Sequence, residues 1–254
     1  MLIAFIYAAM AFYGLSAASE LFFRFKSRHL LFVFAFTLSS SAWFLRWVQV
    51  GHIPLQTMFE IFLALGTLIS PMSLFCRKSL NMRDPLSIFA DGLLGLCLLF
   101  PVGFIFSEDP RPLPPALQSW LFGPHVVVYM LAYVLLAKAA VQAAGGLSVS
   151  PLQREKQTYK LVCLAFPLLT FGLILGSIWG KIAWGDWWGW DPKELWSLAC
   201  WLIYVAYFHW RALWGTRFVK INMWMVLLGF AAILCTLLWV NLSGLFTGLH
   251  NYAG

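Results

Sequence analysis

Eight long apolar runs divide this chain and limit what it can fold into. A helix that crosses a lipid bilayer needs about 20 mainly apolar residues, and each run has about that length. The runs cover residues 2–23, 29–50, 56–76, 85–106, 125–144, 159–180, 192–214 and 222–243. Because 61% of the residues are apolar and only 11% are charged, the chain cannot cover a surface that faces water. The sequence therefore predicts an all-α integral membrane protein with about eight transmembrane helices.

The length of 254 residues leaves only short loops between these spans, so we expect one polytopic membrane domain over residues 1–254. The low charge excludes a soluble enzyme, and the aromatic content of 18% excludes intrinsic disorder. We interpret the first run as a retained span and not a signal peptide, because it lacks a basic segment and a cleavage site. The net charge of +7 is spread over short loops, so we expect no nucleic-acid partner.

Lysine and arginine residues gather in alternate loops. The loops after the first, third, fifth and seventh runs carry twelve of the seventeen, whereas the opposite loops carry four. Basic loops stay on the cytoplasmic side of a membrane. We therefore expect both termini on the outer side, periplasmic or lumenal, together with the segments 51–55, 107–124, 181–191 and 244–254.

The most unusual outer part of the chain is a tryptophan-rich segment at about residues 181–196, called the tryptophan segment below. Within seven residues it contains Trp184, Gly185, Trp187, Trp188, Gly189 and Trp190. Such a segment fits a platform for a large planar ligand, although tryptophans also form plain aromatic belts at membrane interfaces. Asp191, Pro192 and Glu194 then have the pattern of a helix start, with an N-cap aspartate, a first-turn proline and a capping glutamate. Capping alone would explain Asp191 and Glu194, and it would fix the segment on the following helix.

Two histidines are expected on the same side as the tryptophan segment. His125 begins the fifth run, and His250 lies in the C-terminal outer tail. Two neutral imidazoles can ligate a haem iron from opposite faces, and haem is a large planar apolar ligand. A solvated interfacial histidine is the alternative for each of them.

The other three histidines have different surroundings. His209 lies 17 residues after Pro192, about 26 Å along a helix, so we place it near the inner face. It could be a second haem-iron ligand, or it could anchor a helix at the interface. His29 is interpreted as a loop residue, and His52 as an outer residue that could line the site.

Arg46 and Glu60 lie toward the outer ends of their runs. A buried ion pair between them would explain both residues, and a contact of Arg46 with a haem propionate is the alternative.

The tryptophan segment also carries a resemblance to a known family. Residues 184–198 read WGDWWGWDPKELWSL, which resembles the "WWD" signature of haem-handling proteins and, through Asp-Pro-Lys-Glu, the CcsA/ResC family of cytochrome c maturation (system II). Two further stretches are similar to that family: GHIPLQTMFE at 51–60, and VNLSG at 240–244 followed by GLHNY at 248–252. Gln56, Thr57, Met58 and Asn251 depart from its usual residues without removing a candidate ligand.

The resemblance implies a function and its residues. Haem b would be carried across the membrane, held at the outer face, and joined through its vinyl groups to the CxxCH thiols of apocytochrome c. By position, His125 and His250 match the outer iron ligands and His209 matches a transmembrane ligand; no catalytic residue is assigned. The tryptophan platform and Asp191 would complete the haem-binding segment.

The same resemblance implies partners and a location. A haem-lyase or holocytochrome c synthase activity would need a ResB/CcsB-type membrane protein and a thiol-reducing protein. The chain would lie in the bacterial inner membrane, or in the thylakoid membrane if it is plastid-encoded. Two alternatives stay open: a CcmC-type protein that delivers haem to a chaperone, and a membrane transporter or scaffold without haem.

Overall fold

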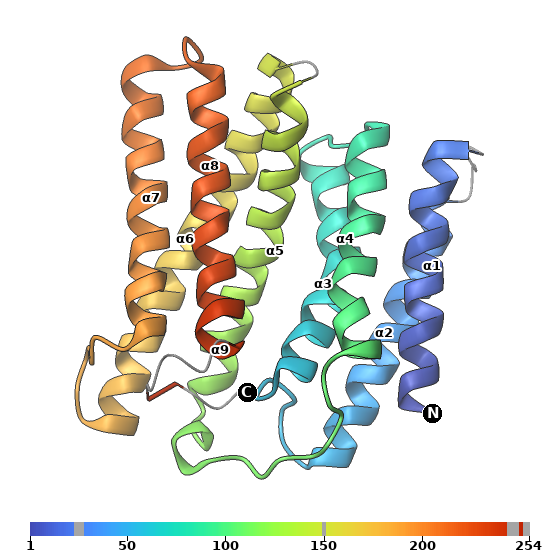
Figure 1. Ribbon diagram of the computed structural model, residues 1–254, viewed down its shortest axis with the longest axis vertical. Coiled ribbons are helices and arrows are strands. Elements are labelled where there is room, and N and C mark those ends of the chain that lie inside the picture. The colour runs from blue at the N-terminus through green and yellow to red at the C-terminus, as the bar shows by residue number, and fades with distance from the viewer. Residues whose placement is uncertain (23–27, 149–150, 243–248, 251–254) are drawn as a thin grey trace. The chain divides into compact units, whose positions relative to one another are not determined.

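The computed structural model describes residues 1–22, 28–148, 151–242 and 249–250 (Figure 1). These residues are almost entirely helical, and the described part of the chain contains no strand. The prediction of an all-α protein is therefore confirmed.

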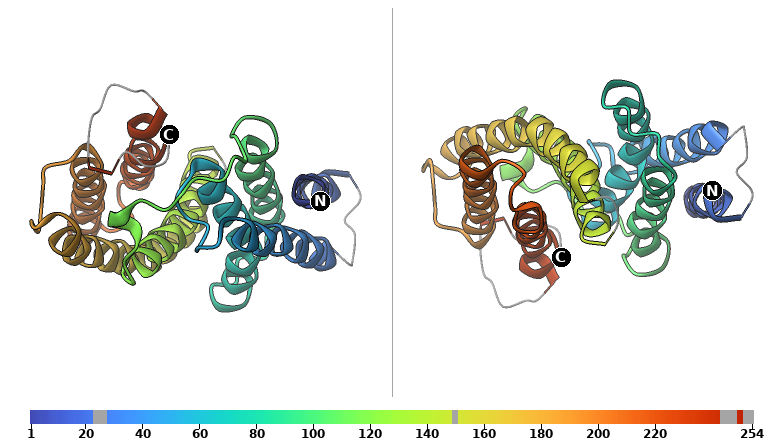
Figure 2. Two further views of the ribbon diagram at one scale, coloured as in Figure 1. Left: turned by 90° about the horizontal axis from the view of Figure 1, so that it is seen from below. Right: turned by 90° about the horizontal axis from the view of Figure 1, so that it is seen from above.

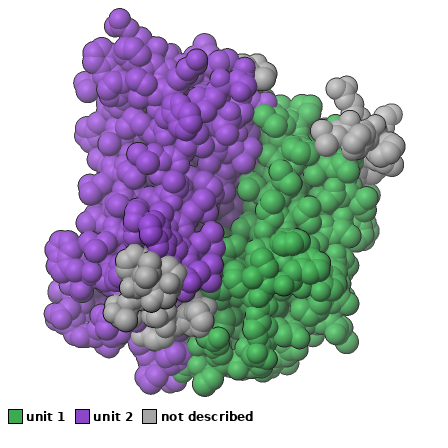
Figure 3. All heavy atoms as spheres, in the orientation of Figure 1, with its two compact units in different colours: residues 1–113 green, residues 114–254 purple. Residues whose placement is uncertain are grey.

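The chain divides into two compact units, residues 1–113 and 114–254 (Figure 3). The described helices of the first unit are α1 (Leu2–Phe22), α2 (Arg28–Val50), α3 (Met58–Ser79) and α4 (Pro85–Phe104). Those of the second unit are η1 (Pro115–Leu117), α5 (Phe122–Gly146), α6 (Pro151–Trp184), α7 (Pro192–Trp214), α8 (Val219–Leu234), η2 (Cys235–Trp239) and α9 (Val240–Leu242). A single membrane domain over 1–254 stays a prediction.

Seven of the described helices are long and apolar enough to cross a membrane: α1 to α6, and α8 continued through η2 and α9. Large apolar side chains on them face outward, among them Phe44 and Phe171, which are 62% and 61% exposed and are suited to lipid contact. Helix α7 has a spanning length of 23 residues, but its charged, tryptophan and tyrosine side chains make it less apolar. The count of eight spans and the outer position of both termini stay predictions.

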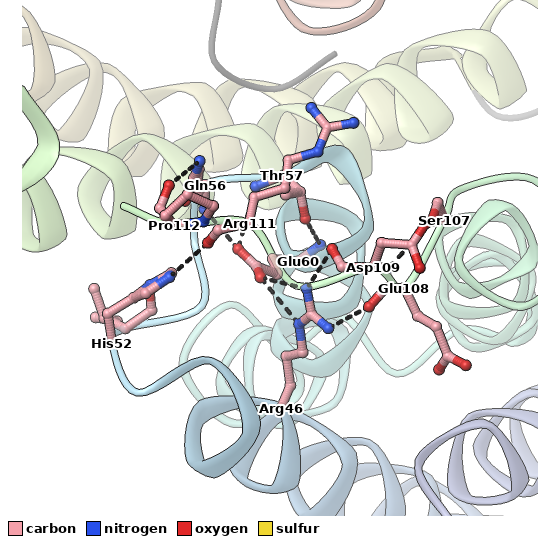
Figure 4. A network of polar contacts seen from close by, with 11 residues as sticks. Arg46, His52, Gln56, Thr57, Glu60, Ser107, Glu108, Asp109, Arg111 and Pro112 are labelled. Atoms are coloured by element: carbon pink, nitrogen blue, oxygen red, sulfur yellow. Dashed lines mark hydrogen bonds and ion pairs between the residues drawn. The ribbon is translucent and has the colours of Figure 1, made fainter. Parts of the chain in front are cut away.

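A buried ion pair holds together one end of the first unit (Figure 4). Arg46 of α2 lies 2.9 Å from the Glu60 carboxylate of α3, and both side chains are 1% exposed. Arg46 also donates to the backbone carbonyls of Glu108 and Asp109, at 2.5 and 3.4 Å. Glu60 in turn closes a capping box with Thr57 at the start of α3. The structural pairing is therefore confirmed, since the guanidinium of Arg46 is already engaged by the carboxylate and the 108–109 backbone.

Helix α6 differs from the span expected at 159–180. It begins at Pro151, because polar residues continue the helix beyond the apolar run, and it extends to Trp184. Gly180 remains helical, and the chain leaves the helix at Gly185, whose φ is +89°. Trp184 is therefore on α6 and not in the loop. The helix contains Pro167 and curves along its length (Figure 2).

The buried carboxylate of Glu155 joins three helices of the second unit. Arg211 of α7 donates to both carboxylate oxygens of Glu155 of α6, at 2.6 and 3.2 Å. Asn222 of α8 donates to the same carboxylate at 3.1 Å. This group lies at the start of α6, the end of α7 and the start of α8, so it ties these helices at the end away from the tryptophan segment (Figure 1).

Candidate functional site

One end of the second unit brings together most of the residues that the sequence singles out. The start of α5, the end of α6 and the start of α7 lie at this end (Figure 1). Residues 249–250 lie against it through ring contacts with α6 and a hydrogen bond from α7. His125, the tryptophan segment with Asp191, and His250 are thus gathered from three separate parts of the chain.

His125 lies in the first turn of α5 and is seated against α6. Its Nδ1 lies 3.0 Å from the carbonyl oxygen of Gly172. A Cβ atom on Gly176 would come within 2.6 Å of the imidazole, so only glycine leaves room for the ring there. Because a carbonyl only accepts hydrogen bonds, Nδ1 must carry the proton. The lone pair of Nε2 is then free to bind a metal.

His250 is held by the first turn of α7. Its Nδ1 lies 3.1 Å from Oδ1 of Asp191, an ion-pair distance without good hydrogen-bond geometry. Lys193 Nζ donates to the backbone carbonyl of His250 at 2.6 Å. The ring packs edge-on against Trp184, with centroids 4.5 Å apart. As with His125, the protein engages the Nδ1 side of the ring.

The side chain of Trp179 packs against both imidazoles. Its ring centroid lies 5.8 Å from that of His125 and 5.4 Å from that of His250. The side chain is 2% exposed, and its indole N–H donates to the carbonyl of Ala116 at 3.0 Å. The sequence analysis did not select Trp179, because it lies inside an apolar run and outside the tryptophan segment. Its spacing of three and seven residues from Gly176 and Gly172 would have placed it on the helix face that seats His125.

Trp184, Trp187, Trp188 and Trp190 of the tryptophan segment have different surroundings. Trp184 contacts Trp179 as well as His250, with ring centroids 4.7 Å apart in the first pair. Trp187 and Trp190 are 57% and 68% exposed. Trp188 packs edge-on against Trp190 at 6.2 Å, and its indole N–H is buried with no partner among the described residues. The segment therefore offers exposed aromatic faces and one unused donor, and only Trp184 touches an imidazole.

The helix start within the tryptophan segment is confirmed. Asp191 is the N-cap of α7 and accepts from the Lys193 N–H at 2.9 Å. Glu194 closes the capping box and also accepts from the backbone N–H of Gly189 at 2.8 Å. Burial opposes ionisation of Asp191, but the adjacent His250 and the N–H groups of Lys193 and Leu249 outweigh it, so the pKa of Asp191 lies below its ordinary value. The carboxylate is the charged form at neutral pH.

The remaining histidines lie apart from this pair. His209 is exposed on α7, and its Nδ1 lies 2.8 Å from the carbonyl of Val205, one turn earlier in the same helix. His52 belongs to the first unit, where its ring nitrogens lie 3.0 and 3.4 Å from the carbonyls of Ile53 and Arg111. His29 stands in α2, and not in a loop as expected, but its side chain is outside the described residues. Gly244, Gly248, Asn251 and Tyr252 of the C-terminal motif are also outside them.

The donor set at this end suits haem iron better than a bare metal ion. Among the residues that the structure describes, no three or more His, Cys, Asp or Glu side chains are grouped to hold a metal. Two imidazoles are sufficient for haem iron, because the porphyrin supplies the other four ligands. The described contacts leave the Nε2 atoms of His125 and His250 as the available pair.

Comparisons with known proteins decide the family. A family model described as "Cytochrome C assembly protein" matches residues 1–247. The CcsA protein of Synechococcus sp. (strain RCC307) is 31% identical over 88% of this chain and 83% of its own length. The CcsA protein of Guillardia theta is also 31% identical, over 82% of this chain and 79% of its own length. The chain belongs to the CcsA family of cytochrome c assembly proteins.

The fold of this CcsA-family chain is also found in a solved structure. It is similar to the "Cytochrome c Heme Lyase CcmF", with a TM-score of 0.75 over 92% of this chain. The identity is 21%, and the chain spans 45% of the CcmF chain. The likeness therefore shows a shared helical fold, in agreement with the membrane helices described above.

Proposed function

We propose that this chain is the haem-handling subunit of a cytochrome c synthase. One observation carries the proposal: two imidazoles from distant parts of the sequence meet on Trp179, each with Nδ1 engaged by the protein. Such a pair suits the two axial positions of a haem iron, with His125 and His250 binding through Nε2. CcsA family membership agrees with a role in cytochrome c assembly.

In this proposal haem b is the substrate, because its two vinyl groups are the sites of attachment. The exposed Trp187 and Trp190 hold the porphyrin by its faces. The buried, unused N–H of Trp188 is a donor that a haem propionate could accept from. Trp184 and Trp179 fix the imidazoles, so the site orients haem and leaves a vinyl edge accessible.

The bond-forming step needs no external oxidant or reductant. Each apocytochrome thiol adds across one vinyl double bond: sulfur bonds to the inner vinyl carbon, and a proton adds to the outer carbon. The chain's contribution is to hold haem in position, which makes the addition effectively intramolecular. The CxxCH thiols must arrive reduced. The five cysteines of this chain are free and contain no C-x-x-C pair, so a separate thiol-reducing protein is proposed.

Haem has to reach the outer site, and His209 is the proposed ligand on that route. Its imidazole is exposed on α7, with Nδ1 turned to its own helix and Nε2 available. Haem iron held there would take its second axial ligand from another chain, for which a ResB/CcsB-type membrane protein is the proposed source. We place the complex in the bacterial inner membrane, or in the thylakoid membrane of a plastid.

Co-expression tests the proposed function. The chain is produced with a ResB/CcsB-type protein and an apocytochrome that contains CxxCH, and covalent haem is measured on the denatured cytochrome. We expect covalent haem with the wild-type chain and little with the His125→Ala/His250→Ala variant. Bound haem without attachment would favour the CcmC-type delivery protein, and the absence of haem would favour a transporter or scaffold.

A further inference from the structure

We infer that Asp191 is a positioning residue that fixes which nitrogen of His250 binds haem iron. The inference rests on the proposed function, because it takes His250 as an iron ligand. It gives the last aspartate of the tryptophan segment a role beyond starting a helix.

The first turn of α7 holds residues 249–250 at several points. Oδ1 of Asp191 lies 3.1 Å from Nδ1 of His250, and the Leu249 N–H also contacts the Asp191 carboxylate. On the other side of the backbone, Lys193 Nζ donates to the His250 carbonyl at 2.6 Å. Asp191 is 6% exposed, so water does not replace these contacts easily. The ring and the main chain of His250 are therefore both fixed to one helix start.

A negative carboxylate 3.1 Å from Nδ1 repels a ring lone pair at that nitrogen, so it favours the imidazole form with the proton on Nδ1. The lone pair then lies on Nε2, which points away from Asp191. A carboxylate behind a metal-binding histidine also raises the basicity of the ligand, and removal of such partners costs about 10- to 100-fold in metal affinity or activity. Asp191 would thus set both the orientation and the strength of the iron bond from His250.

Helix capping is the competing explanation for the same residue. Asp191 does cap α7, through the Lys193 N–H. Asparagine and serine are about as good at this position as aspartate, but neither carries a charge. Asp191→Asn and Asp191→Ser therefore keep the cap and remove the carboxylate behind His250.

The test compares haem retention in the full-length chain, purified in mild detergent, by following haem transfer to an excess of an apoglobin acceptor. We expect Asp191→Asn and Asp191→Ser to lose haem about 10- to 100-fold faster than wild type, with a weakened low-spin spectrum. The matched control is Asp84→Asn, which makes the same change at the N-cap of α4, a helix of the first unit. It should retain haem as wild type does, and all three variants should unfold at the wild-type temperature in the haem-free state.

A double-variant cycle separates positioning from a structural role. In a His250→Ala background, Asp191→Asn should have no further effect on haem retention if Asp191 acts through His250. The inference would be overturned if Asp191→Asn accelerated haem loss as much in the His250→Ala background as in the wild-type chain. It would also be overturned if Asp191→Asn alone retained haem as wild type does. If the wild-type chain lacks haem, or the His125→Ala/His250→Ala variant keeps its low-spin haem, the proposed function itself fails.

Discussion

Gly176 has no side chain, and the imidazole of His125 occupies the space that a side chain would take. The nearest ring atom would lie 2.6 Å from a Cβ at this position, closer than such atoms approach. The His125 ring is also tied to the carbonyl of Gly172 one turn earlier. A methyl group on Gly176 would therefore move the proposed iron ligand directly.

Gly176→Ala should lower haem occupancy of the purified chain about tenfold or more, because overpacking of this kind costs about 1–3 kcal/mol and falls on His125. Haem content per protein, from absorption, measures the effect. Gly103→Ala is the matched control: its Cβ would lie 2.8 Å from Tyr7, in the first unit. It should cost stability and leave haem occupancy unchanged. Equal haem loss in both variants would show that general destabilisation, and not the position of His125, is responsible.

The residues of the site could be predicted from the sequence to different extents. His125 and His250 were selected because they are expected on the same side as the tryptophan segment, and Asp191 because it continues that segment. The structure gathers all three. Trp179 was missed, since a tryptophan in an apolar run has the same pattern as a packing residue. The sequence also could not show that Trp184 contacts His250 while Trp187 and Trp190 are exposed. That difference depends on where α6 ends.

Buried polar contacts join helices of the first unit, and the ion pair of Arg46 and Glu60 is one of them (Figure 4). Removal of one partner leaves the other charge buried, at a cost of about 3–5 kcal/mol. Arg46→Met should therefore lower the thermal unfolding temperature in detergent strongly. Arg46→Met/Glu60→Met should recover part of the loss, because no unpaired charge remains.

The exposed Arg83 supplies the control for this experiment. Its side chain contacts only the Arg77 backbone carbonyl in the described hydrogen bonds, so Arg83→Met should change the unfolding temperature little. If the double variant is no more stable than Arg46→Met, the loss comes from the contacts of Arg46 with the 108–109 backbone and not from the unpaired Glu60 carboxylate.

Helix boundaries were predicted less well than the helices themselves. Apolar runs mark the part of a helix that suits lipid, whereas the helix continues as long as its backbone hydrogen bonds do. Helix α6 thus includes the polar residues after Pro151 and ends four residues beyond Gly180. The start of α7 was predicted correctly, because Asp191, Pro192 and Glu194 specify the cap by local chemistry.

At the scale of the whole molecule, the position of α7 decides whether the tryptophan segment and His209 lie on opposite sides of a membrane. The helix has 23 residues, enough to span, although it is less apolar than the seven candidate spans. The excess of Lys and Arg in alternate loops predicts that it crosses from the outer to the cytoplasmic side.

Cysteine labelling checks this topology in intact cells. In a background without the five native cysteines, Asp186→Cys and Thr216→Cys place thiols at exposed positions before and after α7. A membrane-impermeant maleimide should label position 186 in intact cells and position 216 only after permeabilisation. Labelling of both positions from the outside would contradict a spanning α7 and the proposed inner position of His209.

The fold class and family were accessible from the sequence because composition and one dense motif are enough for both. The division into units at residues 113 and 114 was not predicted, although the charged, proline-rich stretch 107–115 (SEDPRPLPP) lies at that boundary. The meeting of His125 with His250 also depends on packing between α5, α6 and the tail, which no local pattern encodes.

The absorption spectrum of the reduced, purified chain tests the central claim most directly. Wild type should show sharp low-spin haem bands, and the His125→Ala/His250→Ala variant should lose them, because these two imidazoles are the proposed iron ligands. His52→Ala removes an imidazole whose nitrogens lie against the Ile53 and Arg111 carbonyls, so it should leave the bands unchanged. Unchanged low-spin bands in the double variant, or no haem in the wild-type chain, would contradict a haem site between His125 and His250.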